Sequence, residues 1–230
     1  VYMYISSIYA SKILNAGAFQ RLLRGGGGGG PGVGGSLGAS GAISALLTNP
    51  LDLLKTWIHE AEQAGLSDPT AMCLATLGPD GAPRSRMVLC KGVEGTTVRF
   101  FTNLTSDKAQ QLHADGRASL TFWWPDMDRS TRLVGHVTPL ERDEVEAYFA
   151  SRPRSSQIGA WVSDQSSEIE DRAALEAKHV DVHARFEGHD VPCPPHWGGF
   201  RFHAHEVEYC CLLYTSDAAD DTPCVDLGGR

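Results

Sequence analysis

The residues of this chain best suited to bind an anion are concentrated between Ser151 and Ser167. This segment reads SRPRSSQIGAWVSDQSS and combines two arginines, several serines and two glutamines around a short apolar centre. A guanidinium presents a planar fork of donors that fits a phosphate group, and serine hydroxyls add short neutral hydrogen bonds. The segment therefore predicts a binding site for a phosphorylated small molecule.

A second candidate for phosphate binding is the segment FTNLTSDK, from Phe101 to Lys108. Its pattern is that of a strand followed by a hydroxyl-rich turn and the start of a helix. The free amide groups at a helix N-terminus attract anions, and Lys108 adds a positive charge beside them. We therefore expect a second anion to bind at this turn.

A third polar segment, RMVLCK, runs from Arg86 to Lys91. In a strand, successive side chains point to opposite faces of the sheet. One face then carries Arg86, Val88 and Cys90, and the other carries Met87, Leu89 and Lys91. Such a strand can serve two ligands, although the spacing alone fits an edge strand with solvated charges equally well.

These segments belong to a region, Asn49 to Tyr209, whose apolar pattern predicts strands joined by short turns. We expect six strands, at Ala71–Leu77, Arg84–Lys91, Thr97–Asn103, Arg117–Trp124, Thr131–Val137 and Gly198–Tyr209. Short connections favour antiparallel pairing, so a barrel is expected rather than an alternating βαβ sheet. The predicted fold class is mainly β with peripheral helices, an α+β architecture.

Helices are expected around this barrel. The first begins with Asn49 as its N-cap and Pro50 in its first turn. Another begins at Thr138, where Glu141 completes a capping box. A third, highly charged helix is expected from Ser167 to Phe186. The anion-binding segment between Ser151 and Ser167 therefore lies between two helices.

The segment from Ser151 to Ser167 resembles the signature of the pyridoxine (pyridoxamine) 5′-phosphate oxidases, FMN flavoproteins of the split-barrel type. The resemblance implies a six-stranded antiparallel FMN-binding split barrel and a homodimer with FMN at the subunit interface. It implies oxidation of pyridoxine or pyridoxamine 5′-phosphate to pyridoxal 5′-phosphate in vitamin B6 metabolism, with O2 as acceptor and H2O2 as product. Two alternatives are an FMN-binding protein without oxidase activity and a related flavin oxidase for another ring substrate.

The same resemblance assigns roles to individual residues. The substrate phosphate is assigned to Lys91, Tyr148, Arg152 and Ser156. FMN is assigned to Arg86, Met87, Val88, Leu89, Cys90, Lys91, Phe101, Thr102, Lys108, Ser130, Gln165 and Ser166. Two positions depart from the family pattern, because Asp107 replaces an arginine and Ser130 replaces a glutamine. No side chain is an obvious general base, and no metal site is expected.

The composition limits the classes of function. With 28 acidic and 20 basic residues the formal net charge is −8, which argues against nucleic acid bound by a broad basic surface. No apolar run approaches the roughly 18 residues of a membrane-spanning helix. The six cysteines show no CxxC spacing, so a reducing, cytoplasmic location is expected.

The two ends differ in composition from the region between them. No acidic residue precedes Asp52, and 12 of the 25 glycines lie between Gly17 and Gly41. Residues 1–48 are therefore interpreted as a low-complexity leader, either an organellar transit peptide or a non-native translation. Residues 211–230 resemble a translated sequencing adapter. The expected oxidase domain spans residues 49–210 and is truncated at its C-terminus, where Cys210 occupies the position of a family tryptophan.

Overall fold

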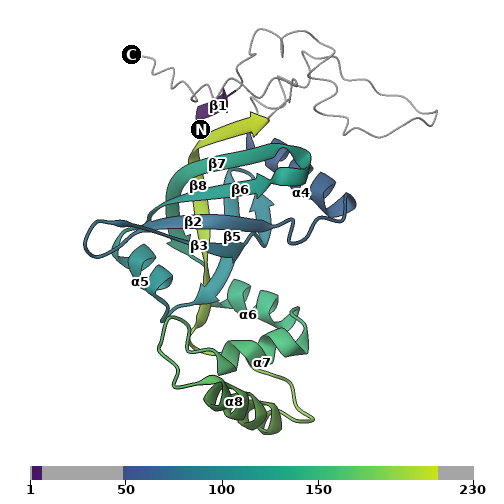
Figure 1. Cartoon of the computed structure of the whole chain (residues 1–230), viewed down its shortest axis with the longest axis vertical. Coiled ribbons are helices and arrows are strands. Elements are labelled where there is room, and N and C mark those ends of the chain that lie inside the picture. The colour runs from purple at the N-terminus through teal and green to yellow at the C-terminus, as the bar shows by residue number, and fades with distance from the viewer. Residues whose placement is uncertain (1, 7–48, 212–230) are drawn as a thin grey trace, which may run out of the picture.

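The computed structural model describes residues 2–6 and 49–211, in which one curled sheet carries helices on its outside (Figure 1). The strands are β1 (Tyr2–Ser6), β2 (Ala71–Leu77), β3 (Pro83–Leu89), β4 (Gly92–Glu94), β5 (Thr97–Asn103), β6 (Arg117–Trp124), β7 (Arg129–Pro139) and β8 (Trp197–Cys211). The helices are α4 (Leu51–Gln63), α5 (Asp107–Ala114), α6 (Arg142–Ala150), α7 (Arg154–Val162) and α8 (Arg172–Arg185), with one 3-10 turn, η1 (Pro125–Met127).

The strands follow the order β3-β2-β6-β7-β8-β5-β4, and every neighbouring pair on this path is antiparallel. Strand β1 lies off the path and pairs in parallel with β8. The predicted mainly β fold with peripheral helices is confirmed, but the prediction of six strands was wrong. Strand β4 has only three residues, which is too short for an alternating pattern to be recognised. Strand β1 lies within residues 1–48, which were interpreted as a low-complexity leader and not as part of the barrel.

A bulge between β7 and β8 helps the sheet to curl. The register of the two strands shifts between Val134 and Gly135. A Cβ atom on Gly135 would lie 2.1 Å from the carbonyl oxygen of His203, so only glycine permits this close approach. Bulges increase the local twist of a strand pair, which turns the sheet towards a half-barrel.

The main hydrophobic core fills the inner face of this sheet, and helix α4 packs against it. The hydroxyl of Tyr209, near the end of β8, donates to the carbonyl oxygen of Pro50 at 2.5 Å and accepts from the backbone N–H of Leu54 at 3.1 Å. Burial raises the pKa of Tyr209, so its hydroxyl stays protonated and able to donate. The far end of β8 is thereby joined to the first turn of α4.

A second cluster of buried side chains lies among the helices at the other end of the sheet. Its members are Val145, Phe149, Ile158, Val162, Phe186, Val191 and Trp197. They come from α6, α7, the segment after α8 and the first residue of β8. Figure 1 shows α6, α7 and α8 stacked below the sheet. This cluster holds α7, which lies within the Ser151–Ser167 segment, and α6, which precedes that segment.

Three helix predictions need correction. Helix α4 begins at Leu51 and its N-cap is Pro50 rather than Asn49, although the side chain of Asn49 accepts the N–H of Leu51 at 3.3 Å. Thr138 still belongs to β7, where its hydroxyl bonds the ring Nε2 of His203 across the strands at 2.9 Å, and α6 begins only at Arg142. Helix α8 begins at Arg172 rather than Ser167, because the side chain of Asp171 accepts the N–H of Ala174 and caps it.

Helix α7 was not predicted from the sequence. Its residues include two serines and a glycine, which lower helix propensity in a short segment. The helix forms because Ile158 and Val162, four residues apart, are both buried in the second cluster. Tertiary packing therefore decides the conformation of the anion-binding segment.

No helix in the described ranges is long and apolar enough to cross a membrane. The expectations for residues 7–48 and 212–230 lie outside the described residues. Of residues 1–48, the structure describes only strand β1, Tyr2–Ser6.

Candidate functional site

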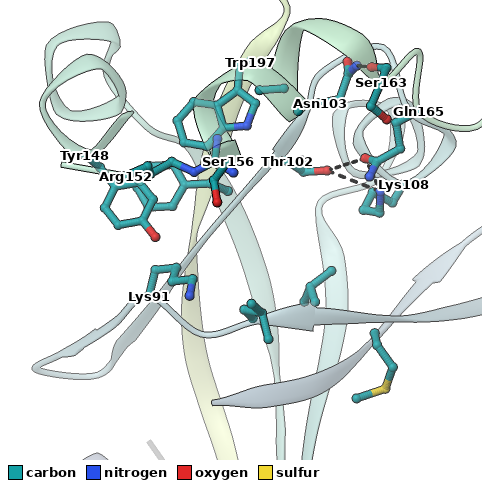
Figure 2. Close-up of a pocket in the computed structure, with 16 residues that line it drawn as sticks. Lys91, Thr102, Asn103, Lys108, Tyr148, Arg152, Ser156, Ser163, Gln165 and Trp197 are labelled. Carbon is teal, nitrogen blue, oxygen red and sulfur yellow. Dashed lines mark hydrogen bonds between the residues drawn. The ribbon is translucent and has the colours of Figure 1, made fainter. Parts of the chain in front are cut away.

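A cavity of about 410 Å³ lies where strands β3 and β5 meet helices α6 and α7. Its lining residues are Met87, Val88, Leu89, Lys91, Phe101, Thr102, Asn103, Lys108, Tyr148, Arg152, Ser156, Gly159, Ala160, Ser163, Gln165 and Trp197. Figure 2 shows the labelled side chains in two groups, one around Lys108 and Gln165 and one around Tyr148 and Arg152. The cavity therefore brings together the three polar segments of the sequence.

The first group surrounds the ammonium of Lys108. Only 8% of this residue is exposed. Its Nζ donates to Oε1 of Gln165 at 2.6 Å and to the hydroxyls of Thr102 and Ser106, each at 3.3 Å. Burial lowers the pKa of Lys108, and the nearby positive charge of Arg86 lowers it further. A buried cation held by neutral groups, with a second cation close by, favours binding of an anion.

Arg86 stands behind this group and does not line the cavity. Its guanidinium donates to the hydroxyl of Thr76 at 2.5 Å and to the side-chain oxygen of Gln111, on α5, at 2.8 Å. Burial lowers its pKa. These bonds fix the guanidinium against α5, from which its charge acts on Lys108.

Asp107 and Ser166 lie beside the same group. The backbone N–H of Asp107, the first residue of α5, donates to the hydroxyl of Ser166 at 3.3 Å. The side chain of Asp107 is exposed, as expected for a carboxylate beside an anion site, yet its negative charge still acts on Lys108 and Arg86. Ser166 does not line the cavity.

The second group contains all four residues assigned to the substrate phosphate: Lys91, Tyr148, Arg152 and Ser156. Tyr148 lies in the last turn of α6 and its ring stacks on Phe101, with centroids 4.0 Å apart. Burial raises the pKa of Tyr148, which keeps its hydroxyl protonated. The Nη1 atom of Arg152 is buried without a hydrogen-bond partner in the described part of the chain. An unsatisfied buried donor is costly, so an acceptor bound beside this guanidinium would lower the cost.

Two other predicted residues lie away from the cavity lining. Cys90 follows β3 and is buried, with its thiol directed to the carbonyl oxygen of Gly92 at 3.6 Å. Burial raises the pKa of this thiol to about 11, so it is a poor nucleophile. Ser130 lies on β7, paired in register with Trp123 of β6 and Cys210 of β8. Neither residue is brought to the cavity within one chain.

Five lining residues were not among the predicted site residues: Asn103, Gly159, Ala160, Ser163 and Trp197. The side chain of Asn103 donates to the carbonyl oxygen of Ser163 at 3.2 Å and holds the end of α7 on β5. Ser156, Gly159, Ala160 and Ser163 have the i, i+3, i+4, i+7 spacing of one helix face. That spacing of small residues is the signal that would have identified Gly159, Ala160 and Ser163.

Comparisons with known proteins agree with this geometry. The family model described as pyridoxamine 5′-phosphate oxidase matches residues 58–186. The pyridoxine/pyridoxamine 5′-phosphate oxidase of Serratia proteamaculans (strain 568) is 47% identical over 164 residues, which cover 71% of this chain and 76% of that protein. The chain belongs to the pyridoxamine 5′-phosphate oxidase family. A second relative with that enzyme name, from Shewanella frigidimarina (strain NCIMB 400), is 44% identical over 164 residues, 71% of this chain and 77% of that protein.

Solved structures support the family fold. PhzG from Burkholderia lata 383, in complex with tetrahydrophenazine-1-carboxylic acid, matches with a TM-score of 0.66 and 32% identity, covering 70% of this chain and 79% of PhzG. A pyridoxamine 5′-phosphate oxidase-related, FMN-binding protein from Nostoc punctiforme PCC 73102 matches with a TM-score of 0.56 and 17% identity. The match covers 70% of this chain and 83% of that protein. The predicted split barrel is therefore confirmed, and family membership makes the chain a flavin-dependent oxidoreductase.

Proposed function

We propose that this chain catalyses the FMN-dependent oxidation of pyridoxine 5′-phosphate or pyridoxamine 5′-phosphate to pyridoxal 5′-phosphate, with O2 as acceptor and H2O2 as product. The observation that carries the proposal is a single cavity with two separate groups of cationic and hydroxyl donors. No Asp or Glu is among the residues that line it. Two donor groups in one cavity fit two phosphate esters, one on the cofactor and one on the substrate.

The group around Lys108 fits the phosphate of FMN. Its donors are the ammonium of Lys108, the hydroxyl of Thr102 and the amides at the start of α5, with Arg86 behind them. Strand β3 contributes Met87, Val88 and Leu89 to the lining, where apolar side chains and backbone would contact a flavin ring. When bound, FMN supplies the hydride acceptor and passes the electrons to O2.

The group around Arg152 fits the phosphate of the substrate. Lys91 and Arg152 supply positive charge, while Tyr148 and Ser156 supply neutral donors. Fixing the phosphate holds the substrate ring in one orientation, and such positioning lowers the barrier without a general base. The contribution of the protein is therefore binding, orientation and exclusion of water.

The second candidate is a flavin oxidase that acts on another ring substrate. The reason is that the chain is 32% identical to PhzG, whose structure contains tetrahydrophenazine-1-carboxylic acid. The two candidates differ in their need for phosphate at the substrate. The unsatisfied Nη1 of Arg152, close to a tyrosine and a serine hydroxyl, supports the phosphorylated substrate.

The experiment is to load the purified protein with FMN and to measure peroxide release with pyridoxamine 5′-phosphate and with pyridoxamine. Peroxide release with the phosphate ester alone supports the proposal. A yellow protein that releases no peroxide would indicate an FMN-binding protein without oxidase activity. Equal rates with both compounds would favour the second candidate.

We further propose that residues 49–210 form the oxidase domain and that two copies associate through the exposed sheet surface that β3 and β6 present beside the cavity. The supporting observation is a set of large apolar side chains that the single chain leaves exposed. Met87 is 64% exposed and Leu89 41%, both on edge strand β3, and Trp123 on β6 is 63% exposed. Exposed apolar side chains gathered beside a ligand site are typical of an interface.

A further inference from the structure

The guanidinium of Arg152 is oriented by aromatic rings rather than by hydrogen bonds. Its Cζ lies 4.8 Å from the ring centroid of Trp197 and 5.6 Å from that of Phe149. Within the described residues no carboxylate pairs with Arg152, and its buried Nη1 has no partner. A cation over an aromatic face is attracted by the ring quadrupole, so Trp197 supplies the main contact that fixes this charge.

The ring of Trp197 is itself tightly held. It stacks on Phe101 with centroids 5.2 Å apart and an interplanar angle of 3°, and it meets Phe149 edge-on at 5.0 Å and 70°. Only 6% of Trp197 is exposed, although the residue contributes to the cavity lining. Phe101 in turn stacks on Tyr148. One aromatic stack therefore connects two of the residues assigned to the substrate phosphate.

Arg142 fixes the main chain that carries Trp197. Its Nη1 donates to the carbonyl oxygens of Trp197 at 3.0 Å and Pro194 at 3.2 Å, and its Nη2 donates to that of Cys193 at 3.0 Å. A planar guanidinium can serve three carbonyls at once, which a lysine ammonium cannot do with the same geometry. Arg142 begins α6, so it ties this loop to the helix that ends near Arg152.

We propose that Trp197 is a positioning residue for the phosphate of the substrate. Its ring holds the Arg152 guanidinium at the cavity, where the guanidinium can donate to a phosphomonoester, and Arg142 anchors the main chain that carries the ring. This inference rests on the proposed function, because it takes the group around Arg152 as the substrate-phosphate site. Trp197 acts through Arg152 and makes no contact with the reacting atoms in this account.

The test compares Trp197→Leu and Trp197→Phe in the FMN-loaded protein. Because Trp197→Leu removes a desolvated cation–π contact, it is expected to raise KM for pyridoxamine 5′-phosphate about tenfold. The value of kcat should stay within about twofold, since phosphate binding is shared by ground and transition states. Trp197→Phe keeps an aromatic face and should restore most of the affinity.

The matched control is Trp161→Leu. Trp161 also carries an arginine over its ring, with Cζ of Arg185 at 5.0 Å, and it packs on the same hydrophobic cluster, but it does not line the cavity. Its substitution should leave KM unchanged even where it lowers the thermal unfolding temperature. Equal rises in KM for the two leucine variants, or no rise for Trp197→Leu, would overturn the positioning role.

Arg142→Lys gives a second test that leaves every aromatic ring in place. It should raise KM in the same direction as Trp197→Leu and alter the fluorescence of the protein, because the main chain at Trp197 loses its anchor. An unchanged KM would contradict the anchoring role of Arg142.

Direct titration of the FMN-loaded variants with pyridoxal 5′-phosphate separates this inference from the proposed function. If the wild-type protein binds the phosphate ester but oxidises no substrate, the proposed function fails and the comparison of dissociation constants still tests Trp197. A tenfold weaker affinity in Trp197→Leu is the expected result. If the wild-type protein binds no phosphate ester, both proposals are overturned.

Discussion

At the scale of single residues, the site depends on cations that have no carboxylate as a hydrogen-bond partner. Lys108 is buried among a glutamine and two hydroxyls, and Arg152 rests on aromatic rings with one donor unsatisfied. The sequence predicted both residues through the resemblance of their segments to a family signature. It did not predict Trp197 or Asn103 as lining residues, because their roles depend on contacts between β5, β8 and α7 that no local pattern reveals.

The first prediction concerns the cofactor phosphate. Lys108→Met should weaken FMN binding at least tenfold, because a hydrogen bond to a charged group contributes roughly 1.5–3 kcal/mol. Quenching of FMN fluorescence on titration with protein measures this affinity. Lys178→Met is the control, since Lys178 pairs with Asp164 on the surface and lies outside the cavity. Equal affinities for Lys108→Met and the control would remove Lys108 from the cofactor site.

The second prediction concerns the acidic residue beside Lys108. Asp107→Asn should tighten FMN binding about threefold at low salt, because it removes a negative charge near the phosphate, and added salt should reduce the difference. Asp115→Asn, just beyond the other end of α5, provides the control. A weaker affinity in Asp107→Asn would show that the carboxylate assists binding rather than opposing it.

At the scale of elements, alternation and turns predicted the central strands well. Strand β2 alternates between half-buried and buried residues along its whole length, and the sequence gives the same bounds, Ala71–Leu77. The short strand β4 and helix α7 were missed for different reasons. Strand β4 has no room for a pattern, and α7 is formed by burial of two side chains in the second cluster rather than by helix propensity.

A charged network connects the elements around the cavity. Glu144 of α6 accepts hydrogen bonds from Arg99 of β5 at 2.8 Å and from Arg201 of β8 at 2.8 Å. Arg99 also pairs with Glu94 of β4 at 2.7 Å. The backbone N–H of Lys91 donates to the carbonyl oxygen of Arg99 at 2.8 Å, so the network links Lys91 to the helix that carries Tyr148.

The third prediction is a pH dependence of stability. The hydrogen bond that Arg99 donates to Glu144 lowers the pKa of this carboxyl group from its ordinary value of 4.5, and the nearby charge of Arg201 lowers it further. A carboxyl group with a lowered pKa in the folded state stabilises the fold above its unfolded value, and this contribution is lost as the pH falls through the lowered pKa. Glu144→Gln should therefore lower the free energy of unfolding at pH 7 and cost progressively less below pH 4.5.

Urea unfolding of wild-type and variant protein at a series of pH values measures this difference. Glu176→Gln is the matched control, because Glu176 makes an exposed ion pair with Arg172 on α8. Exposed pairs contribute little, so this variant should match the wild type at every pH. A pH-independent loss in Glu144→Gln would show that packing, not charge, accounts for its effect.

At the scale of the whole molecule, the cavity lies next to a sheet surface on which β3 and β6 expose large apolar side chains. The fourth prediction is that the FMN-loaded protein is a dimer, with twice the chain mass of 24.8 kDa in light scattering. Trp123→Ser should shift the equilibrium towards monomer, because Trp123 is 63% exposed on β6 in the single chain. A monomer at micromolar concentration with FMN fully bound would contradict the dimer proposal.

The central claim is that one cavity binds two phosphate esters, with the group around Arg152 reserved for the substrate. The most direct measurement is the ratio of kcat/KM for pyridoxamine 5′-phosphate to that for pyridoxamine, in the FMN-loaded wild type and in Arg152→Met. The account predicts a large ratio in the wild type that falls at least tenfold in the variant, with FMN affinity unchanged, since a hydrogen bond to a charged group contributes roughly 1.5–3 kcal/mol. A ratio near one in the wild type, or one that Arg152→Met leaves unaltered, would contradict it.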